Sequence, residues 1–106
     1  MVDYTLAMFK VVLTDAFEKW LDSLRDPSTR QRLVLRIRKA TLGNLGDVKP
    51  VGRGVFEMRE AFGPGWRMYF VRRGNILILM LGGGTKATQG RDIARAIALA
   101  ETIEEN

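Results

Sequence analysis

The chain of 106 residues is long enough for one domain with its own core, and 46% apolar with 27% charged residues is typical of a globular protein. It contains no Cys and no His, which excludes disulfides, thiolate nucleophiles and the usual transition-metal ligands. The longest apolar run, residues 76–81, falls far short of the ~20 residues of a membrane span, and the N-terminus lacks the pattern of a secretory signal. We therefore expect one cytoplasmic domain over residues 1–106, without membrane segment, metal or cofactor.

The net charge of +5 is unevenly distributed along the chain. Residues 23–54 carry eight Lys and Arg against two acids, and residues 55–90 carry five against two, whereas both ends are mildly acidic. A basic middle segment suggests an anionic partner, with nucleic acid as the leading candidate. A solvated basic surface that only maintains solubility explains the charge equally well.

The first part of the chain predicts a strand followed by a helical hairpin. Residues 3–12 mix β-branched and aromatic residues in rough alternation, which is typical of a strand. Thr14 is a suitable N-cap for a helix whose apolar stripe runs over residues 17–24. Asp26 and Pro27 then suit the N-cap and first position of a second helix.

The second helix carries a basic ridge beside its apolar stripe. Three cations at spacings of four and three form this ridge: Arg32, Arg36 and Lys39. Like charges at these spacings repel by a few tenths of a kcal/mol, so a ridge that is kept despite this cost is a candidate RNA-binding surface. A merely solvated face is an equally good explanation.

Glycine-rich sequence follows the second helix. Gly43 is a suitable C-cap, and residues 43–54 (GNLGDVKPVGRG) predict a connector without regular structure. Lys49 and Arg53 lie in this connector and are candidate phosphate contacts, or else parts of a solvated turn.

From Val55 the apolar pattern has a period of two, which predicts strands. A hairpin over residues 55–73 turns at AFGPG, a tight turn follows at residues 72–75, and residues 76–81 predict a central strand covered on both faces. GGGTKATQGRD then leads into a last helix that begins near Thr88. The predicted order is β-α-α-β-β-β-α, an α+β domain with a mostly antiparallel sheet against the helical hairpin.

The 55–73 hairpin places four polar side chains on one sheet face. With a turn centred near residues 62–64, Arg59 and Arg67 lie nearly opposite each other, and Glu57 and Tyr69 lie one step further along. A slip of one residue would place aromatic residues opposite the arginines, so the apolar pattern favours this register. Two facing arginines destabilise a bare sheet unless an anion lies between them. Glu57 is the internal candidate for that anion, and a phosphodiester is the external one.

Such a face supports only certain chemistry. Phosphoryl transfer depends mainly on positioning and charge neutralisation, and arginine binds phosphate oxygens bidentately. RNA supplies its own nucleophile, the 2′-OH, so its cleavage requires neither a metal nor a histidine. Glu57, Tyr69 or a lysine can assist proton transfer. Lys86 of GGGTK, a segment without the spacing of a phosphate-binding loop, is expected on the same rim as Arg67. A generic basic binding surface is the simpler alternative.

Four motifs in order resemble the RelE/ParE toxin superfamily: WLDSLRD, GNLGDVKPVGRGVFEMRE, GPGWRMYF and GGGTKATQGRDIARA. They are most similar to the HigB-like, phage-derived killer proteins of addiction modules, and the resemblance covers nearly the whole chain. Two features differ from that subgroup. Gly84 and Thr85 precede Lys86 where G-G-D-K is usual, and Trp66 replaces a tyrosine.

The resemblance implies a compact α+β toxin whose gene lies beside an antitoxin gene. RNA-cleaving relatives enter the ribosomal A site and cut mRNA through the 2′-OH, while basic residues on the sheet stabilise the phosphate. The basic positions of the motifs correspond to Arg59, Arg67, Lys86 and Lys49. We therefore expect an mRNA endonuclease with five catalytic candidates: Arg67, Arg59, Lys86, Tyr69 and Glu57.

The resemblance also implies partners. The expected ones are the ribosome with its mRNA and a helix-turn-helix antitoxin, which would form a hetero-oligomer with the toxin and dock in the groove beside the last helix. The superfamily includes gyrase poisons and inactive members as well. A non-enzymatic toxin that blocks a target such as DNA gyrase, or an inactive protein, are therefore the alternatives.

Overall fold

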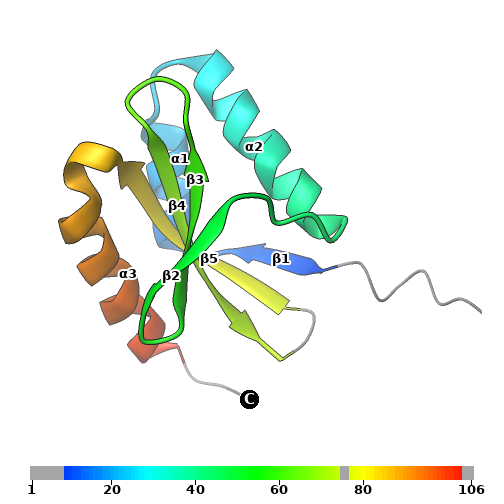
Figure 1. Ribbon diagram of the computed structural model, residues 1–106, viewed down its shortest axis with the longest axis vertical. Helices are drawn as coiled ribbons and strands as arrows, with labels where there is room; N and C mark the ends of the chain where they lie inside the picture. The colour runs from blue at the N-terminus through cyan, green and yellow to red at the C-terminus, as the bar shows by residue number, and fades with distance from the viewer. Residues whose placement is uncertain (1–8, 75–76, 104–106) are drawn as a thin grey trace, which may run out of the picture.

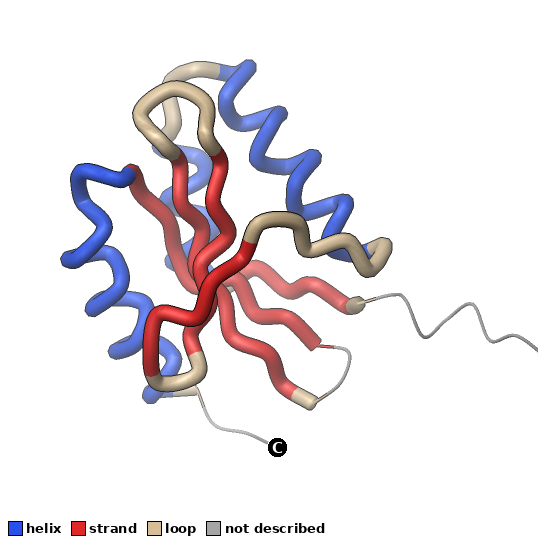
Figure 2. Tube along the Cα trace, viewed as in Figure 1, coloured by secondary structure: helices blue, strands red, loops and turns tan. Residues whose placement is uncertain are grey.

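The computed structural model describes residues 9–74 and 77–103. It contains one five-stranded sheet with helices on both faces (Figure 1; Figure 2). The elements are β1 (Lys10–Leu13), α1 (Asp15–Ser23), α2 (Pro27–Thr41), β2 (Val48–Gly52), β3 (Val55–Glu60), β4 (Trp66–Arg73), β5 (Leu77–Thr85), the 3₁₀ turn η2 (Lys86–Thr88) and α3 (Gln89–Thr102). The strand order is β1-β5-β4-β3-β2, with β1 parallel to β5 and every other pair antiparallel. The predicted α+β class with a mostly antiparallel sheet is confirmed.

The helical hairpin begins each helix where the sequence predicts. The Thr14 hydroxyl accepts a hydrogen bond from the Phe17 N–H at 3.2 Å and also donates to the carbonyl of Met80 in β5. Asp26 accepts from the Ser28 N–H at 3.1 Å, and Pro27 occupies the first position of α2. These caps satisfy N–H groups that the first helical turn leaves without partners, so local chemistry is sufficient to begin both helices.

Two apolar cores lie on opposite faces of the sheet. α1 and α2 pack on one face, and the largest buried side chains there are Phe17, Leu33, Met58, Met68, Phe70, Ile78 and Met80. α3 packs on the other face, against Val55, Val71 and Leu81. β5 contributes Ile78 and Met80 to the first core and Leu81 to the second. The prediction of a central strand covered on both faces is therefore confirmed.

Residues 43–54, expected as a connector, contain the edge strand β2. Lys49 pairs with Glu57 of β3, and the pairing shifts between Pro50 and Gly52. Proline is compatible with an edge strand because its missing N–H is not needed for a neighbouring strand. The glycines and the proline of this segment, which indicated a loop, lie instead in an edge strand and in the turn that follows it. Arg53, in that turn, has a φ of 51°.

The GGGT segment, expected to lead from the apolar strand into the last helix, is instead part of β5. A Cβ on Gly83 would lie 2.4 Å from the Trp20 ring, and one on Gly84 would lie 1.8 Å from Asp92 Oδ2. Close approach of α1 and α3 to the strand therefore requires glycine there. Of the predicted first strand, residues 10–12 lie in β1, which begins at Lys10, and residues 3–8 lie outside the described residues.

The predicted tight turn at residues 72–75 includes Gly74, which has a φ of 65°. Asn75 and Ile76 lie outside the described residues. Within the described parts of the chain, no helix is both long and apolar enough to cross a membrane.

Candidate functional site

The β3–β4 hairpin has the register that its apolar pattern predicts. Glu57 is paired with Tyr69 and Arg59 with Arg67. β2 extends the first row with Lys49, opposite Glu57, and β5 extends the second with a glycine opposite Arg67. Residues paired directly across a sheet share a face. Lys49, Arg59 and Arg67 therefore lie on one face, each contributed by a different strand.

This face is not bare, because α3 covers the part around Glu57. Glu57 and Tyr69 are both fully buried. The Tyr69 hydroxyl donates to Glu57 Oε2 at 3.0 Å, and the side-chain amide of Gln89, the first residue of α3, donates to the same oxygen at 2.7 Å. Burial, the nearby charge of Glu57 and this hydrogen bond raise the pKa of the Tyr69 phenol, which therefore stays protonated at neutral pH.

Glu57 and Tyr69 therefore lie on the predicted face but are not open to a ligand there, as a role in proton transfer to RNA requires. A general acid or base must come within hydrogen-bond distance of the substrate atom that it serves, and these two groups are enclosed between the sheet and α3. Their predicted role in proton transfer to bound RNA loses its geometric basis. Their observed contacts point instead towards Arg67.

Each of the two facing arginines has a carboxylate of its own. Arg67 Nε lies 3.7 Å from Glu57 Oε1, and Arg67 Nη1 donates to the carbonyl of Trp66 at 3.2 Å. Arg59 Nη2 lies 3.1 Å from Asp47 Oδ1, and this acid raises the pKa of the Arg59 guanidinium. Two carboxylates within the chain, one for each arginine, thus relieve the repulsion between the two cations. The sequence pattern did not indicate Asp47 as a partner.

Arg67 and Lys86 meet at Gly65. The backbone N–H of Lys86 donates to the carbonyl of Gly65 at 2.8 Å. A Cβ on Gly65 would lie 3.3 Å from Lys86 Cβ and 3.4 Å from Arg67 Nη1. Gly65 therefore lets a largely buried guanidinium and an exposed lysine come close together, at a position where even a methyl group would be crowded. The predicted common rim of Arg67 and Lys86 is confirmed.

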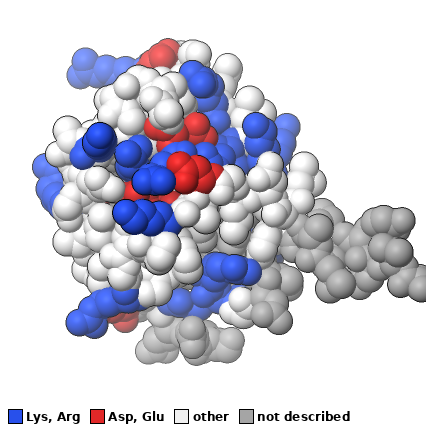
Figure 3. All heavy atoms as spheres, in the orientation of Figure 1, with Lys and Arg blue, Asp and Glu red and all other residues white. Residues whose placement is uncertain are grey.

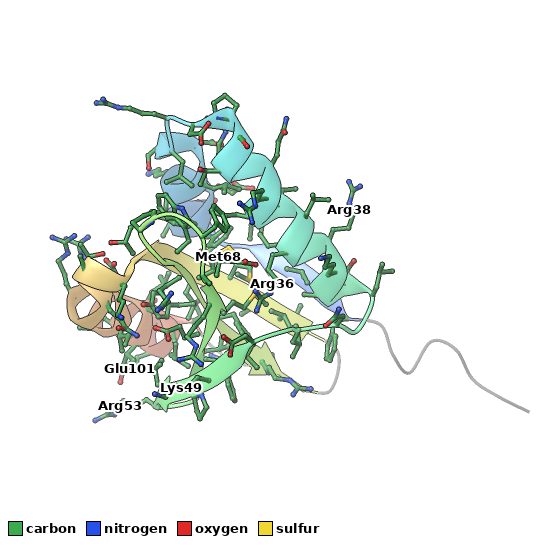
Figure 4. The ribbon with its side chains drawn as sticks, turned by 45° about the horizontal axis from the view of Figure 1, so that its top comes forward. Arg36, Arg38, Lys49, Arg53, Met68 and Glu101 are labelled. Atoms are coloured by element: carbon green, nitrogen blue, oxygen red, sulfur yellow. The ribbon has the colours of Figure 1, made fainter. Side chains whose placement is uncertain are left out.

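The basic ridge predicted on α2 is interrupted at Arg36, which is buried, whereas Arg32 and Lys39 are exposed. Arg36 is 9% exposed, and its guanidinium makes five hydrogen bonds: two to Leu45 O and one each to Asp47 O, Arg59 O and Glu60 Oε1. A guanidinium has five N–H donors, so none is left for a phosphate. Figure 4 shows Arg36 directed towards the sheet, whereas Arg38 points away from it. Arg36 is therefore corrected from an RNA-binding candidate to an internal tie between α2, the connector and β3.

The other predicted contacts differ in their surroundings. The Arg32 guanidinium lies 3.6 Å from the centroid of the Phe62 ring, in the turn of the β3–β4 hairpin, while Lys39 is exposed. Arg53 pairs with Glu101 at 3.3 Å, near the end of α3 (Figure 4). Since Lys86 precedes the start of this helix, whose 14 residues span about 20 Å, Arg53 lies far from the Arg67 rim.

Charge on the visible face of the molecule is mixed. Figure 3 shows Lys and Arg atoms interleaved with Asp and Glu atoms near the centre of this face, with other cations around them. Among the residues that the structure describes, no three acidic side chains gather into a group that could hold a metal ion. The strongest candidate site is the pair of cations beside Gly65, which consists of Arg67 at 12% exposure and the exposed Lys86.

Comparisons with known proteins support the fold. No protein-family model matches the sequence. An uncharacterized protein of Haemophilus influenzae is 35% identical over 94 residues, which cover 89% of this chain and 95% of that protein. A chain in the crystal structure of the toxin-antitoxin complex RelBE2 from Mycobacterium tuberculosis superposes with a TM-score of 0.62 at 19% identity, over 74% of this chain and 99% of that chain. The likeness to the second protein concerns the fold.

Proposed function

We propose that this chain, which belongs to one family with the Haemophilus influenzae protein, is the toxin of a type II toxin–antitoxin module. Its fold is similar to that of a chain in a RelBE2 toxin-antitoxin complex, and its four motifs resemble the HigB-like subgroup of RelE/ParE toxins. A toxin of this kind acts in the cytoplasm and is held inactive by a cognate antitoxin. We further propose that the antitoxin is a helix-turn-helix protein.

We infer that the toxin cleaves mRNA on the ribosome, at the two cations beside Gly65, Arg67 and Lys86. In this reaction the 2′-oxygen of RNA forms a bond to the adjacent phosphorus, and the bond from phosphorus to the 5′-oxygen breaks. The products are a 2′,3′-cyclic phosphate and a 5′-hydroxyl end. Negative charge accumulates on the phosphoryl oxygens in the transition state, and preorganised cations stabilise it. The observation that carries the proposal is that Arg67 Nη1 and the Lys86 side chain both approach Gly65, which places the two cations side by side.

Charge balance at this position gives Lys86 a particular importance. The charge of Arg67 is already opposed by Glu57, whose oxygen lies 3.7 Å away, and Arg59 is paired with Asp47. A phosphate at Gly65 brings a further negative charge to a guanidinium that is already neutralised. Exposed Lys86 then supplies the additional positive charge from the same rim. Arg32, Lys39 and Lys49 are proposed as contacts to the RNA backbone outside the reaction centre.

Mapping 5′ ends of mRNA after induction tests this proposal. Wild-type induction should arrest translation and produce new 5′ ends inside coding sequences, and Lys86→Ala should abolish both while the protein stays folded. Arg67→Ala should do the same, but Lys86→Ala carries more weight because removing Arg67 leaves the buried Glu57 without its cation. Arg53→Ala is the matched control, since it removes an exposed cation whose partner is Glu101.

Three results would contradict the proposal. Growth arrest and cleavage that persist in both Lys86→Ala and Arg67→Ala would exclude the Gly65 position as the reaction centre. Accumulated DNA damage with intact mRNA would instead indicate a gyrase-type toxin, and the absence of any phenotype would indicate an inactive protein.

A further inference from the structure

Glu57 has two oxygens in different surroundings. Oε2 accepts two hydrogen bonds, from the Tyr69 hydroxyl and the Gln89 amide. Oε1 has no hydrogen-bond partner within the described part of the chain, and it faces Arg67 Nε at 3.7 Å. Arg67 Nε is likewise buried and without a hydrogen bond there. The carboxylate is thus held at one oxygen and directs the other towards the arginine.

We propose that Glu57 is a positioning residue for Arg67 and that Gln89 fixes Glu57 in this role. The proposal deepens, and for its catalytic arm rests on, the function proposed above. A buried carboxylate is costly unless a cation and hydrogen-bond donors accompany it. Arg67 supplies the cation through Nε, while Nη1 is held by the Trp66 carbonyl. Two of the guanidinium nitrogens are therefore oriented from within, and the Nη edge lies beside Gly65, next to Lys86.

Gln89 connects this orientation to the other cation of the rim. It is the first residue of α3 and directly follows the 3₁₀ turn that contains Lys86. The backbone of Lys86 is in turn tied to Gly65, at the start of β4. One chain of contacts therefore runs from Arg67 through Glu57 and Gln89 to the turn that presents Lys86. A carboxylate at position 57 sets the relative placement of both cations rather than touching the substrate.

Glu57→Gln separates positioning from a role in folding alone. Glutamine has the same shape and can still accept from Tyr69 and Gln89, but it presents no negative charge to Arg67 Nε. Loss of this charge makes the rim more positive, so RNA binding should stay equal or become tighter. Cleavage should become slower because the guanidinium loses its orientation. A purely structural defect would weaken binding and cleavage together, in proportion to the unfolded fraction.

The first measurement does not depend on activity. The Nε–H signal of Arg67 in ¹⁵N NMR, assigned by its loss in Arg67→Lys, reports how firmly the guanidinium is held. Hydrogen exchange of this proton should accelerate at least about 10-fold in Glu57→Gln, because burial beside Glu57 restricts its opening. Tyr69→Phe is the matched control, since it removes one hydrogen bond at Oε2 of Glu57 but keeps the charge at Oε1. In this variant the exchange rate of the Arg67 Nε–H proton should stay close to the wild-type rate. Equal exchange in Glu57→Gln and wild type would overturn the positioning role.

The second measurement is mRNA cleavage in a reconstituted translation system at varied ribosome concentration. Glu57→Gln should lower the maximal rate by about 10- to 100-fold, as misplacement of a catalytic group does, with an unchanged or lower half-saturating concentration. Gln89→Ala should produce a smaller change of the same kind. An unchanged maximal rate in Glu57→Gln would contradict the proposal. If wild type itself does not cleave, the proposed function fails, and the exchange measurement still decides whether Glu57 positions Arg67.

Discussion

Replacing Arg36 with alanine should destabilise the fold by about 3 kcal/mol, because this side chain ties α2 to the connector and to β3. Its five hydrogen bonds reach three backbone carbonyls and the Glu60 carboxylate, with distances of 2.7–3.1 Å. The same contacts leave it no donor for RNA. The substitution therefore distinguishes an internal tie from a nucleic-acid contact.

The magnitude follows from burial. Removing one partner of a buried ion pair costs about 3–5 kcal/mol, chiefly because the other charge is left unpaired. Arg36 is 9% exposed and Glu60 is 24% exposed, so water can partly solvate the remaining carboxylate and the lower end of that range applies. Arg36→Lys keeps the charge but has fewer donors in a different geometry, and about half of the loss is expected. For a chain of this size, 3 kcal/mol corresponds to a fall in Tm of roughly 10–20 °C.

Urea denaturation at neutral pH measures this free energy, with thermal unfolding as a second probe. Arg38→Ala is the matched control because Arg38 lies on the same helix, is exposed and points away from the sheet (Figure 4). Its effect should stay within about 0.5 kcal/mol. Gly46→Ala disturbs the same contact from the other side, since its Cβ would lie 2.9 Å from Arg36 Cζ and Gly46 has a φ of 69°. This substitution should therefore lower the free energy of unfolding as well.

One pattern of results would refute this reasoning. In this pattern, the free energy of unfolding of Arg36→Ala would lie within about 1 kcal/mol of the wild-type value at an unchanged m-value. The slope of log K against log[salt] for RNA binding would also fall in magnitude by about one, as expected for a lost phosphate contact. That outcome would show that Arg36 is a nucleic-acid contact and not an internal tie.

Two further predictions concern the glycine tract and the buried phenol. Gly84→Ala should destabilise by about 1–3 kcal/mol in urea denaturation, because its Cβ would overlap Asp92, whereas Gly82→Ala, with nothing within 4 Å, should cost far less; equal effects would contradict the proposed close approach of α3. Folding raises the pKa of Tyr69, so its contribution to the free energy of unfolding is fully present below about pH 10 and is lost as the unfolded chain ionises at higher pH. Wild type should therefore lose stability between pH 9 and 11.5 more steeply than Tyr69→Phe, and parallel curves would exclude a raised pKa.

Local sequence determined much of this fold. The caps Thr14 and Asp26 and the proline after the second cap define where α1 and α2 begin, since each acts within its own helical turn. The register of the β3–β4 hairpin follows from apolar alternation, because a slip of one residue would exchange the two faces. For the same reason the facing pair Arg59 and Arg67 could be predicted from the sequence.

The burial of Arg36 had a local indication that its charge obscured. The buried residues of α2 are Thr29, Leu33, Arg36 and Ala40, at spacings of four, three and four. These spacings place Arg36 on the apolar face of the helix. An arginine on that face indicates a buried guanidinium with internal partners, but its partners lie 9 to 24 residues away. Periodicity does not identify such partners.

The state of the candidate site was decided only by tertiary structure. Glu57 and Tyr69 have the alternation of an exposed sheet face, and they are buried because α3, which begins 20 residues after Tyr69, packs over them. The sequence by itself determined which residues share the face of Arg67, since strand periodicity is local. Whether that face meets water or a helix depends on contacts between distant segments. The same docking of α3 brings Gln89 to Glu57, while Arg67 and Lys86 lie together beside Gly65.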